Sequence, residues 1–284
     1  MTGPSPGPGT PQAAAPDPGR LSLNQMTTSR WGVREAVEGC ARAGIRAIGL
    51  WRHKVAETGL AESARIAAGS GVAVSTLCRG GFFPAATAAG RLAAVDDNRA
   101  AIDEAAALGT GVLVLVCGPA PDRDIDAARG MVADGIAAVL PHAEAAGVRL
   151  AVEPMHPVFA GDRSVIVTLG EALDLVDHLG ASQLGVAVDT YHVWWDPQVH
   201  RQLARAAGRI LCLQVCDWLV PVTDPLHGRG MPGDGVIELR RLRTEADAAG
   251  YAGPIEVEIF NHDIWAQPGE RVLEQVWASY LEHV

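Results

Sequence analysis

The sequence has no surplus of basic residues, and this argues against a nucleic-acid partner. It holds 23 Lys and Arg residues against 33 Asp and Glu residues, a net charge of −10 over 284 residues. Proteins bind nucleic acids largely by neutralising phosphates with cationic side chains. We therefore expect no nucleic acid among the partners of this chain.

Membrane spans, signal peptides and paired cysteines are also missing. No stretch reaches the roughly 18 consecutive apolar residues that a membrane helix needs, and the N-terminus lacks the basic and apolar regions of a signal peptide. The five cysteines form an odd set without metal-ligand spacing. We expect a cytoplasmic protein without membrane contact whose cysteines are reduced and buried. These are Cys40, Cys78, Cys117, Cys212 and Cys216.

No GxGxxG or Walker loop opens any predicted helix, so the sequence shows no cradle for a nucleotide cofactor. Residues 1–20 are rich in Pro, Gly, Ala and Ser and offer almost nothing to bury. We expect these residues to form a disordered leader. Residues 21–284 are predicted to form one domain.

From Leu21 onward, short apolar runs alternate with longer amphipathic runs, which is typical of repeated β/α units. Several helical runs end at a glycine, where a left-handed residue stops the helix. The pattern predicts an α/β fold, a single (β/α)₈ TIM barrel. The predicted strands are Leu21–Met26, Ala47–Trp51, Val72–Leu77, Val112–Cys117, Arg149–Glu153, Leu184–Asp189, Ile210–Val215 and Pro254–Phe260. The predicted helices are Val33–Ala43, Glu57–Ala68, Arg91–Leu108, Ile125–Ala146, Leu169–Leu179, Gln198–Ala207, Val236–Ala249 and Glu270–Leu281.

The strand that ends at Asp189 has two faces of different character. Val186 and Val188 share one face, and Ala187 and Asp189 share the other. In a parallel sheet covered by helices the branched face packs outward, so the carboxylate points into the barrel. Three further strands repeat this design, with Glu153, Gln214 and Glu258 on the inward face. The strand C-terminal ends form the active-site face of such a barrel, so these four side chains are predicted to converge.

Three carboxylates and one amide oxygen form an oxygen-rich set, which favours Mg²⁺ or Mn²⁺ as the bound metal ion. Without a cation, buried carboxylates repel one another and the pKa of at least one rises. We predict a metal site with Glu153, Asp189, Gln214 and Glu258 as ligands. The alternative interpretation is that arginine side chains or helix N-termini satisfy these groups.

Further polar and aromatic side chains follow the predicted strands and could contact a substrate. An arginine could clamp an anionic or hydroxylated group, and tryptophans at the rim could wall a pocket for a sugar ring. The tryptophans at this rim are Trp51, Trp194, Trp195, Trp218 and Trp265. The residues that we predict to bind substrate are His192, Arg229, His156, Trp51, Trp195, Trp218 and Arg79. The alternatives are hydrogen-bonded structural histidines, solvated arginines and core tryptophans.

At these residues the chain resembles the sugar phosphate isomerase/epimerase family, the xylose isomerase-like TIM barrels related to ketose 3-epimerases. The resemblance extends from about Leu21 to the C-terminus. It rests on Glu153-Pro, Asp189-Thr-Tyr-His192, Gly228-Arg-Gly230, Gly233-Asp-Gly235 and Glu258-Ile-Phe. It implies that Glu153, Asp189 and Glu258 bind the metal, that Glu153 and Glu258 also transfer protons, and that His192 and Arg229 hold the substrate.

The chain departs from the family pattern at two positions. The family usually has a metal-binding histidine where this chain has Gln214, and an amide oxygen is a weaker ligand that favours Mg²⁺ or Mn²⁺ over Zn²⁺. Phe159 replaces a substrate-binding carboxylate of the ketose epimerases, which favours a bulkier or less polar substrate than a free ketose. Family members often pair near the barrel mouth, so the resemblance is consistent with a homo-oligomer.

The leading hypothesis is a divalent-metal-dependent isomerase or epimerase of a sugar or sugar-like hydroxy-carbonyl compound. One carboxylate would take the proton beside the carbonyl, the metal would stabilise the enediolate, and a second carboxylate would return the proton. The same residues suit a lyase or dehydratase that expels a β-substituent. Less favoured are a non-catalytic sugar-binding barrel and an endonuclease acting on abasic DNA, which would need more histidines and a basic groove.

Overall fold

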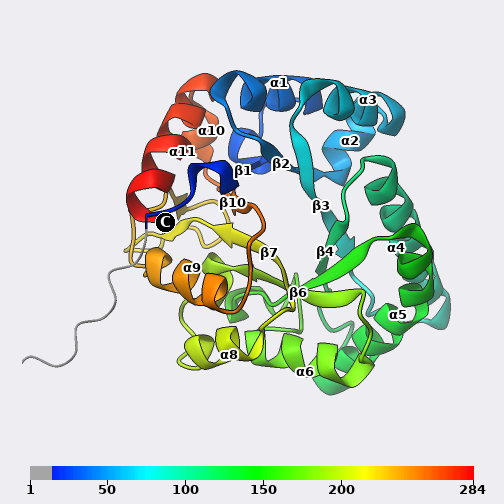
Figure 1. The fold of residues 1–284 in the computed structure, drawn as a ribbon. Coiled ribbons are helices and arrows are strands. Elements are labelled where there is room, and N and C mark those ends of the chain that lie inside the picture. Colours follow the sequence, from blue (N-terminus) through cyan, green and yellow to red (C-terminus); the bar gives the residue numbers. More distant parts are fainter. Residues whose placement is uncertain (1–14) are drawn as a thin grey trace, which may run out of the picture.

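The computed structural model describes residues 15–284, which contain a closed barrel of eight parallel strands (Figure 1). The strand order around the barrel is β1-β10-β7-β6-β5-β4-β3-β2. The predicted fold is confirmed. The barrel strands are β1 (Leu21–Asn24), β2 (Ala47–Trp51), β3 (Ala73–Gly81), β4 (Val112–Val116), β5 (Arg149–Glu153), β6 (Leu184–Asp189), β7 (Ile210–Val215) and β10 (Ile255–Val257).

Helices surround the barrel, as Figure 1 shows. They are α1 (Val33–Ala43), α2 (Arg52–Thr58), α3 (Leu60–Ser70), α4 (Ala88–Ala107), α5 (Ile125–Ala146), α6 (Leu169–Leu179), α8 (Val199–Arg205), α9 (Leu239–Ala248) and α11 (Gly269–His283), with short α7 (Thr190–Val193) and α10 (His262–Trp265). Short 3₁₀ helices are η1 (Pro18–Arg20), η2 (Gln25–Thr28) and η3 (Pro157–Phe159). The prediction of one helix over Glu57–Ala68 is wrong, because the chain breaks at Gly59, whose φ is +89°.

The two faces of each strand pack in different layers. Val186 and Val188 of β6 belong to the large apolar core, whereas Ala187 lies in a separate interior cluster. That cluster contains Cys78, Val112, Val114, Ala151, Ala187 and Cys212. These small and medium side chains come from neighbouring strands and fill the barrel below the polar ends, which confirms the predicted strand phase.

Glycines end the helices where the sequence predicts them. Gly44, Gly147 and Gly180 have φ values of +73°, +68° and +61° and are the C-terminal caps of α1, α5 and α6. A residue with a Cβ is strained in this left-handed region. The chain therefore turns sharply into β2, β5 and β6 and places each strand end at the same face of the barrel.

The structure corrects the prediction of a leader over residues 1–20. Residues 1–14 lie outside the described part, but η1 already packs on the barrel. Arg20 forms an ion pair of 2.7 Å with Asp247, and the Tyr280 hydroxyl donates to the carbonyl oxygen of Asp17 at 2.9 Å. Ordered structure thus begins before Leu21, because Arg20 and Asp17 find partners on α9 and α11 that local composition does not reveal.

The loop after β7 carries a short antiparallel pair, β8 (Asp217–Trp218) and β9 (Arg229–Gly230). The Asp217 carboxylate accepts backbone hydrogen bonds from Trp218, Gly233 and Ile237, so it ties both ends of this loop together. This arrangement fixes the backbone of Arg229 above the barrel.

The five cysteines are free and buried, as predicted. Within residues 15–284, none of the helices combines the length and the apolar character required to span a bilayer.

Candidate active site

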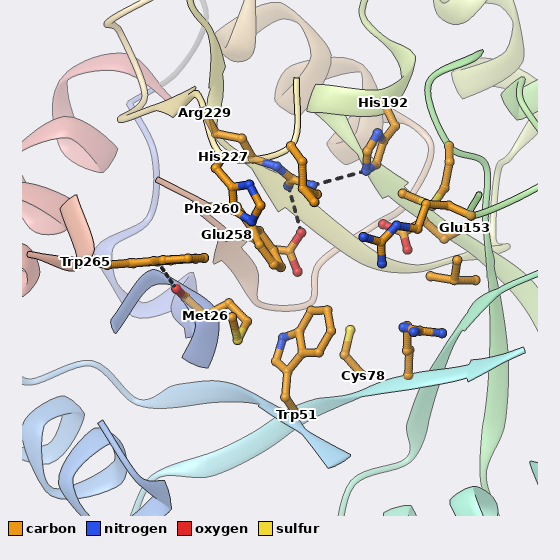
Figure 2. Close-up of a pocket in the computed structure, with 15 residues that line it drawn as sticks. Met26, Trp51, Cys78, Glu153, His192, His227, Arg229, Glu258, Phe260 and Trp265 are labelled. Carbon is orange, nitrogen blue, oxygen red and sulfur yellow. Dashed lines mark hydrogen bonds and ion pairs between the residues drawn. The ribbon is translucent and has the colours of Figure 1, made fainter. Parts of the chain in front are cut away.

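Acidic side chains from β5, β6 and the residue after β10 meet at the strand C-terminal ends. Glu153 closes β5, Asp189 closes β6, and Glu258 follows β10 directly. All three are buried, with exposed fractions of 5%, 0% and 4%. Figure 2 shows Glu153 and Glu258 in the wall of one cavity. The predicted convergence of these carboxylates is therefore what the structure has.

His192 completes a group of potential metal ligands. One atom each from Glu153, Asp189 and His192 can be chosen so that all lie within 4.8 Å of one another. Nε2 of His192 lies 3.5 Å from Oδ2 of Asp189, because α7 begins directly after β6 and returns the histidine over the strand end. The sequence placed His192 among substrate-binding residues, whereas the structure also places it within reach of a metal.

Arg229 lies between two of the carboxylates. Its Nη1 is 3.1 Å from Oδ2 of Asp189. The same Nη1 is 2.9 Å from Oε2 of Glu258, and its Nη2 is 3.3 Å from Nε2 of His192 (Figure 2). Its backbone is held on both sides, since its N–H donates to the carbonyl of Phe260 and its carbonyl accepts from the Asn261 amide. The alternative of arginine-satisfied carboxylates thus holds for Asp189 and Glu258.

Glu153 differs from the other two carboxylates. Within residues 15–284 it forms no hydrogen bond and no ion pair, although it is buried and lines the cavity. The alternative that arginine side chains pair with the carboxylates therefore does not hold for Glu153.

Gln214 lies beneath the carboxylates and is fully buried. Its Nε2 donates to Oε1 of Glu258 at 3.2 Å, and its Oε1 has no hydrogen-bond partner among the described residues. A buried acceptor without a partner is costly. The amide nitrogen of Gln214 thus faces Glu258, its amide oxygen is free among the described residues, and its role as a metal ligand stays a prediction.

Burial raises the pKa values of all three acidic side chains of the site. It raises the pKa of Glu153 well above its usual value, and the charges of Glu258 and Asp189 raise it further. Burial also raises the pKa of Glu258 to about 8, with Arg229 opposing that change. The pKa of Asp189 rises by burial and is held back by Arg229. The pKa of Glu258 thus lies close to neutral pH, and the pKa values of Glu153 and Asp189 lie above their usual values.

His192 is neutral in this environment. Burial lowers the pKa of His192 well below its usual value, and the positive charge of Arg229 lowers it further. Phe159 packs edge-on against its ring, with centroids 5.6 Å apart. A neutral imidazole can donate a hydrogen bond or ligate a metal.

The cavity above the carboxylates encloses about 220 Å³, which suits a small molecule. Of the predicted site residues, Glu153, Glu258, His192, Arg229, Trp51 and Arg79 line it. Trp51 is fixed by two hydrogen bonds, from its backbone to Gln25 and from its Nε1 to Asn24. Asp189 and Gln214 support the cavity from below without lining it.

Three predicted substrate contacts lie beside the cavity and do not line it. His156 stacks on Trp218 with centroids 4.8 Å apart, and Trp195 meets His156 edge-on at 5.5 Å. Trp218 also contacts Tyr191 and Trp194. These residues form an aromatic cluster of their own, and their contact with a substrate stays a prediction.

Several lining residues were not among the predicted contacts. They are Met26, Cys78, Val116, Met155, Arg163, Leu226, His227, Phe260 and Trp265. Trp265 was placed at the rim by its position after a strand, and its Nε1 donates to the Met26 carbonyl at 2.6 Å. Arg163 lies in an irregular segment without periodicity, so no local pattern marks it.

The site residues fit a divalent cation by charge and by donor type. Three carboxylates belong to Glu153, Asp189 and Glu258, and among the described residues the one guanidinium that contacts them is that of Arg229. His192 and the unpartnered Oε1 of Gln214 supply neutral donors. Arg229 Nη1 already contacts Oδ2 of Asp189 and Oε2 of Glu258, so a cation that uses either of these oxygens must compete with this guanidinium.

Comparison with known proteins places the chain in context. A family model described as xylose isomerase-like TIM barrel matches residues 37–279. The crystal structure of protein SMc04130 from Sinorhizobium meliloti is 51% identical, with a TM-score of 0.91 and coverage of 93% of this chain and 98% of that one. The structure of IolI protein with a bound zinc atom has a TM-score of 0.80 at 19% identity, covering 92% and 96%, and shows a shared fold.

A curated relative has a stated reaction. The chain is 31% identical over 166 residues to a 3-dehydroshikimate dehydratase of Pseudomonas aeruginosa, which covers 57% of this chain and 25% of that protein. The matched part is thus a quarter of the relative's length.

Proposed function

Since the chain belongs to the xylose isomerase-like TIM barrel family, we propose that it is a divalent-metal-dependent isomerase or epimerase of a sugar or sugar-like hydroxy-carbonyl compound. The observation that carries this proposal is the pair Glu153 and Glu258, two buried carboxylates that line one cavity and whose pKa values are raised. Paired carboxylates of this kind suit the removal and return of a proton.

We propose Glu153 as the base of the pair, since a cation bound beside it would offset the burial and the like charges that raise its pKa. Its carboxylate has no partner within the described residues, so no hydrogen bond must break before it accepts a proton from the carbon beside the substrate carbonyl. Glu258 has a pKa of about 8 and can carry a proton at neutral pH, which it returns to the neighbouring carbon or to the opposite face of the same carbon. The first outcome is isomerisation and the second is epimerisation.

Glu153, Asp189, Glu258 and the neutral donors Gln214 and His192 would hold the cation. When bound, a divalent cation polarises a carbonyl and stabilises the negative charge that follows proton removal. We propose Mn²⁺ or Mg²⁺ for this role, because most of the donors are oxygens.

The remaining lining residues bind and orient the substrate. Arg229 and His192 line the cavity, where the guanidinium N–H groups of Arg229 can hold substrate oxygens beside the imidazole of His192. Trp51 and Trp265 supply apolar walls that exclude water from the reacting carbon. We further propose a cytoplasmic enzyme whose partner is a sugar-like small molecule, with self-association into a homo-oligomer.

A dehydratase is the second candidate, and the 31% identity to the Pseudomonas aeruginosa dehydratase favours it. In that reaction Glu153 removes the proton, the C–H electrons form a carbon–carbon double bond, and the β-hydroxyl takes a proton from Glu258 and leaves as water. Both candidates share the first step and the same residues.

Proton exchange with solvent tests the proposal. The full chain, loaded with Mn²⁺ in D₂O, is incubated with a panel of ketoses and hydroxy-keto acids. NMR should show deuterium beside the carbonyl of at least one compound, and chelation of the metal should abolish the signal. Product mass separates the candidates, because isomerisation leaves the formula unchanged and dehydration removes one water. Absence of both exchange and product across the panel would contradict the proposal.

A further inference from the structure

Two arginines line the cavity without a carboxylate partner from another part of the chain. Within residues 15–284, no hydrogen bond or ion pair holds Arg79, whose Cζ lies 4.1 Å from the centroid of the Phe82 ring. Arg163 lies 3.3 Å from the carboxylate of its neighbour Asp162, which is largely exposed. Nε of Arg163 is buried and makes no hydrogen bond.

This situation contrasts with other partly buried arginines of the chain. Arg52 binds Glu104 at 2.7 Å and Asp97 at 3.0 Å, and the deeply buried Arg229 bridges Asp189 and Glu258. A guanidinium removed from water normally requires such an anion. Among the described residues, Arg79 has no anion within hydrogen-bond distance, and the carboxylate beside Arg163 is that of Asp162, which is largely exposed, although both arginines line the cavity.

The backbones that carry the two arginines are fixed to the same strand. After β3, the N–H of Phe82 donates to the carbonyl of Val116 at the end of β4. In the segment after β5, the carbonyl of Arg163 accepts from the N–H of Gly118, and the N–H of Val165 donates to the carbonyl of Gly118. The two guanidinium groups are therefore held on either side of the β4 end.

The two positive charges act on each other. Burial lowers the pKa of Arg79, and the charge of Arg163 lowers it further. Two like charges in the partly buried wall of a cavity repel each other unless an anion binds between them. The arrangement is thus complementary to a small anionic group.

We propose that Arg79 and Arg163 form an anion subsite of this cavity and that the substrate carries a carboxylate or a phosphate group there. The planar guanidinium fork suits both groups, because each offers two oxygens to parallel N–H donors. This inference rests on the proposed function, since it takes the cavity to be the substrate site. The inference adds the requirement that the substrate carries a negative charge, which neither the fold nor the pair Glu153 and Glu258 imposes.

Probes that share a glucose skeleton and differ at C6 test the subsite. D-glucuronate and D-glucose 6-phosphate are each compared with neutral D-glucose by titration of the full Mn²⁺-loaded chain, followed by tryptophan fluorescence and calorimetry. We expect at least one anionic probe to bind about tenfold or more tightly than glucose, a difference of about 1.4 kcal/mol. The carboxylate and phosphate arms show which anion the subsite prefers.

Substitution locates the effect. Arg79→Met and Arg163→Met should each remove most of the preference, Arg79→Lys should keep part of it, and Arg201→Met should leave it unchanged. Arg201 is an exposed residue of α8, and its substitution removes the same charge at a distance from the cavity. Equal binding of charged and neutral probes by the wild-type chain, or an intact preference in both methionine variants, would overturn the proposal.

The outcome is separable from that of the proposed function. Anion preference through Arg79 and Arg163 without any solvent exchange would retain the subsite and remove the reaction. Exchange into neutral compounds that is unaffected by either methionine substitution would retain the reaction and remove the subsite.

Discussion

Glu256 and Glu258 lie two residues apart on the same inward face, yet their surroundings differ. Glu256 accepts hydrogen bonds from Ser75 at 2.8 Å, Thr76 at 2.6 Å and Asn24 at 3.1 Å, all neutral donors. Glu258 is bound by Arg229 and Gln214 and opens on the cavity. Burial raises the pKa of both carboxyl groups.

The difference separates a structural carboxylate from a chemical one. Neutral hydroxyl and amide donors saturate Glu256, so it has no remaining surface on which a ligand could act. Glu258 shares one charged partner with Asp189 and faces Glu153 across a space large enough for a small molecule. Burial alone therefore does not identify a catalytic carboxylate. A catalytic carboxylate also lacks a full set of hydrogen-bond partners and borders a space that a small molecule can enter.

The largest expected effect tests the difference between Glu256 and Glu258 directly. Glu153→Gln and Glu258→Gln should lower the solvent-exchange rate by about 10² to 10⁴, the usual contribution of a general acid or base. Glu256→Gln should keep the exchange rate within a few fold and lower the free energy of unfolding by about 1 to 3 kcal/mol, since one of its two acceptor oxygens becomes an amide group that donates. NMR exchange and chemical denaturation measure the two quantities. Equal loss of exchange in Glu256→Gln and Glu258→Gln would remove the distinction.

Substitution of Arg229 should have the second largest effect, because its guanidinium offsets the negative charges of Asp189 and Glu258. Without a cation, Arg229→Met should lower the free energy of unfolding by about 3 to 5 kcal/mol, as expected for a buried ion pair that loses one partner. Mn²⁺ should restore much of this loss and bind more tightly than to wild type, because the competing guanidinium is gone. Denaturation with and without Mn²⁺ tests this, with Arg229→Lys as the charge-retaining control. Unchanged Mn²⁺ affinity in Arg229→Met would show that the guanidinium and the cation do not compete.

The smallest expected effect concerns the layer around Glu256. A Cβ on Gly49 would lie 2.4 Å from Oε2 of Glu256 and 2.8 Å from Oγ1 of Thr76, whereas a Cβ on Gly111 would meet nothing within 4 Å. Gly49→Ala should therefore cost about 1 to 3 kcal/mol by overpacking, and Gly111→Ala much less. Thermal unfolding of both variants measures the difference. A neutral effect of Gly49→Ala would mean that the hydrogen-bonded layer around Glu256 is loosely held.

The strand period explains which parts of the site were predictable. Alternation by two residues places Asp189, Glu153, Gln214 and Glu258 on the inward face, and the common direction of the strands brings their ends together. The same alternation treats Glu256 and Glu258 alike, because it specifies a face and says nothing about partners.

The loops were less predictable for a physical reason. Arg229 reaches Asp189 and Glu258 because Phe260 and Asn261 hold its backbone, and those contacts join segments distant in sequence. The segment of Arg163 is likewise fixed by hydrogen bonds to Gly118. Tryptophan position after a strand correctly marked Trp51, but Trp218 turns toward its own aromatic cluster. Such choices depend on tertiary packing and leave no local pattern.

Most of the proposed chemistry depends on one property of the site. We propose that Glu153, Asp189 and Glu258 together hold a divalent cation. Crystals of the full chain soaked in Mn²⁺ and measured for anomalous scattering test it most directly. We expect one strong peak bounded by Glu153 and Asp189, with Arg229 withdrawn from at least one of its two carboxylates. A map without a peak at this position, with Arg229 still bridging Asp189 and Glu258, would contradict it.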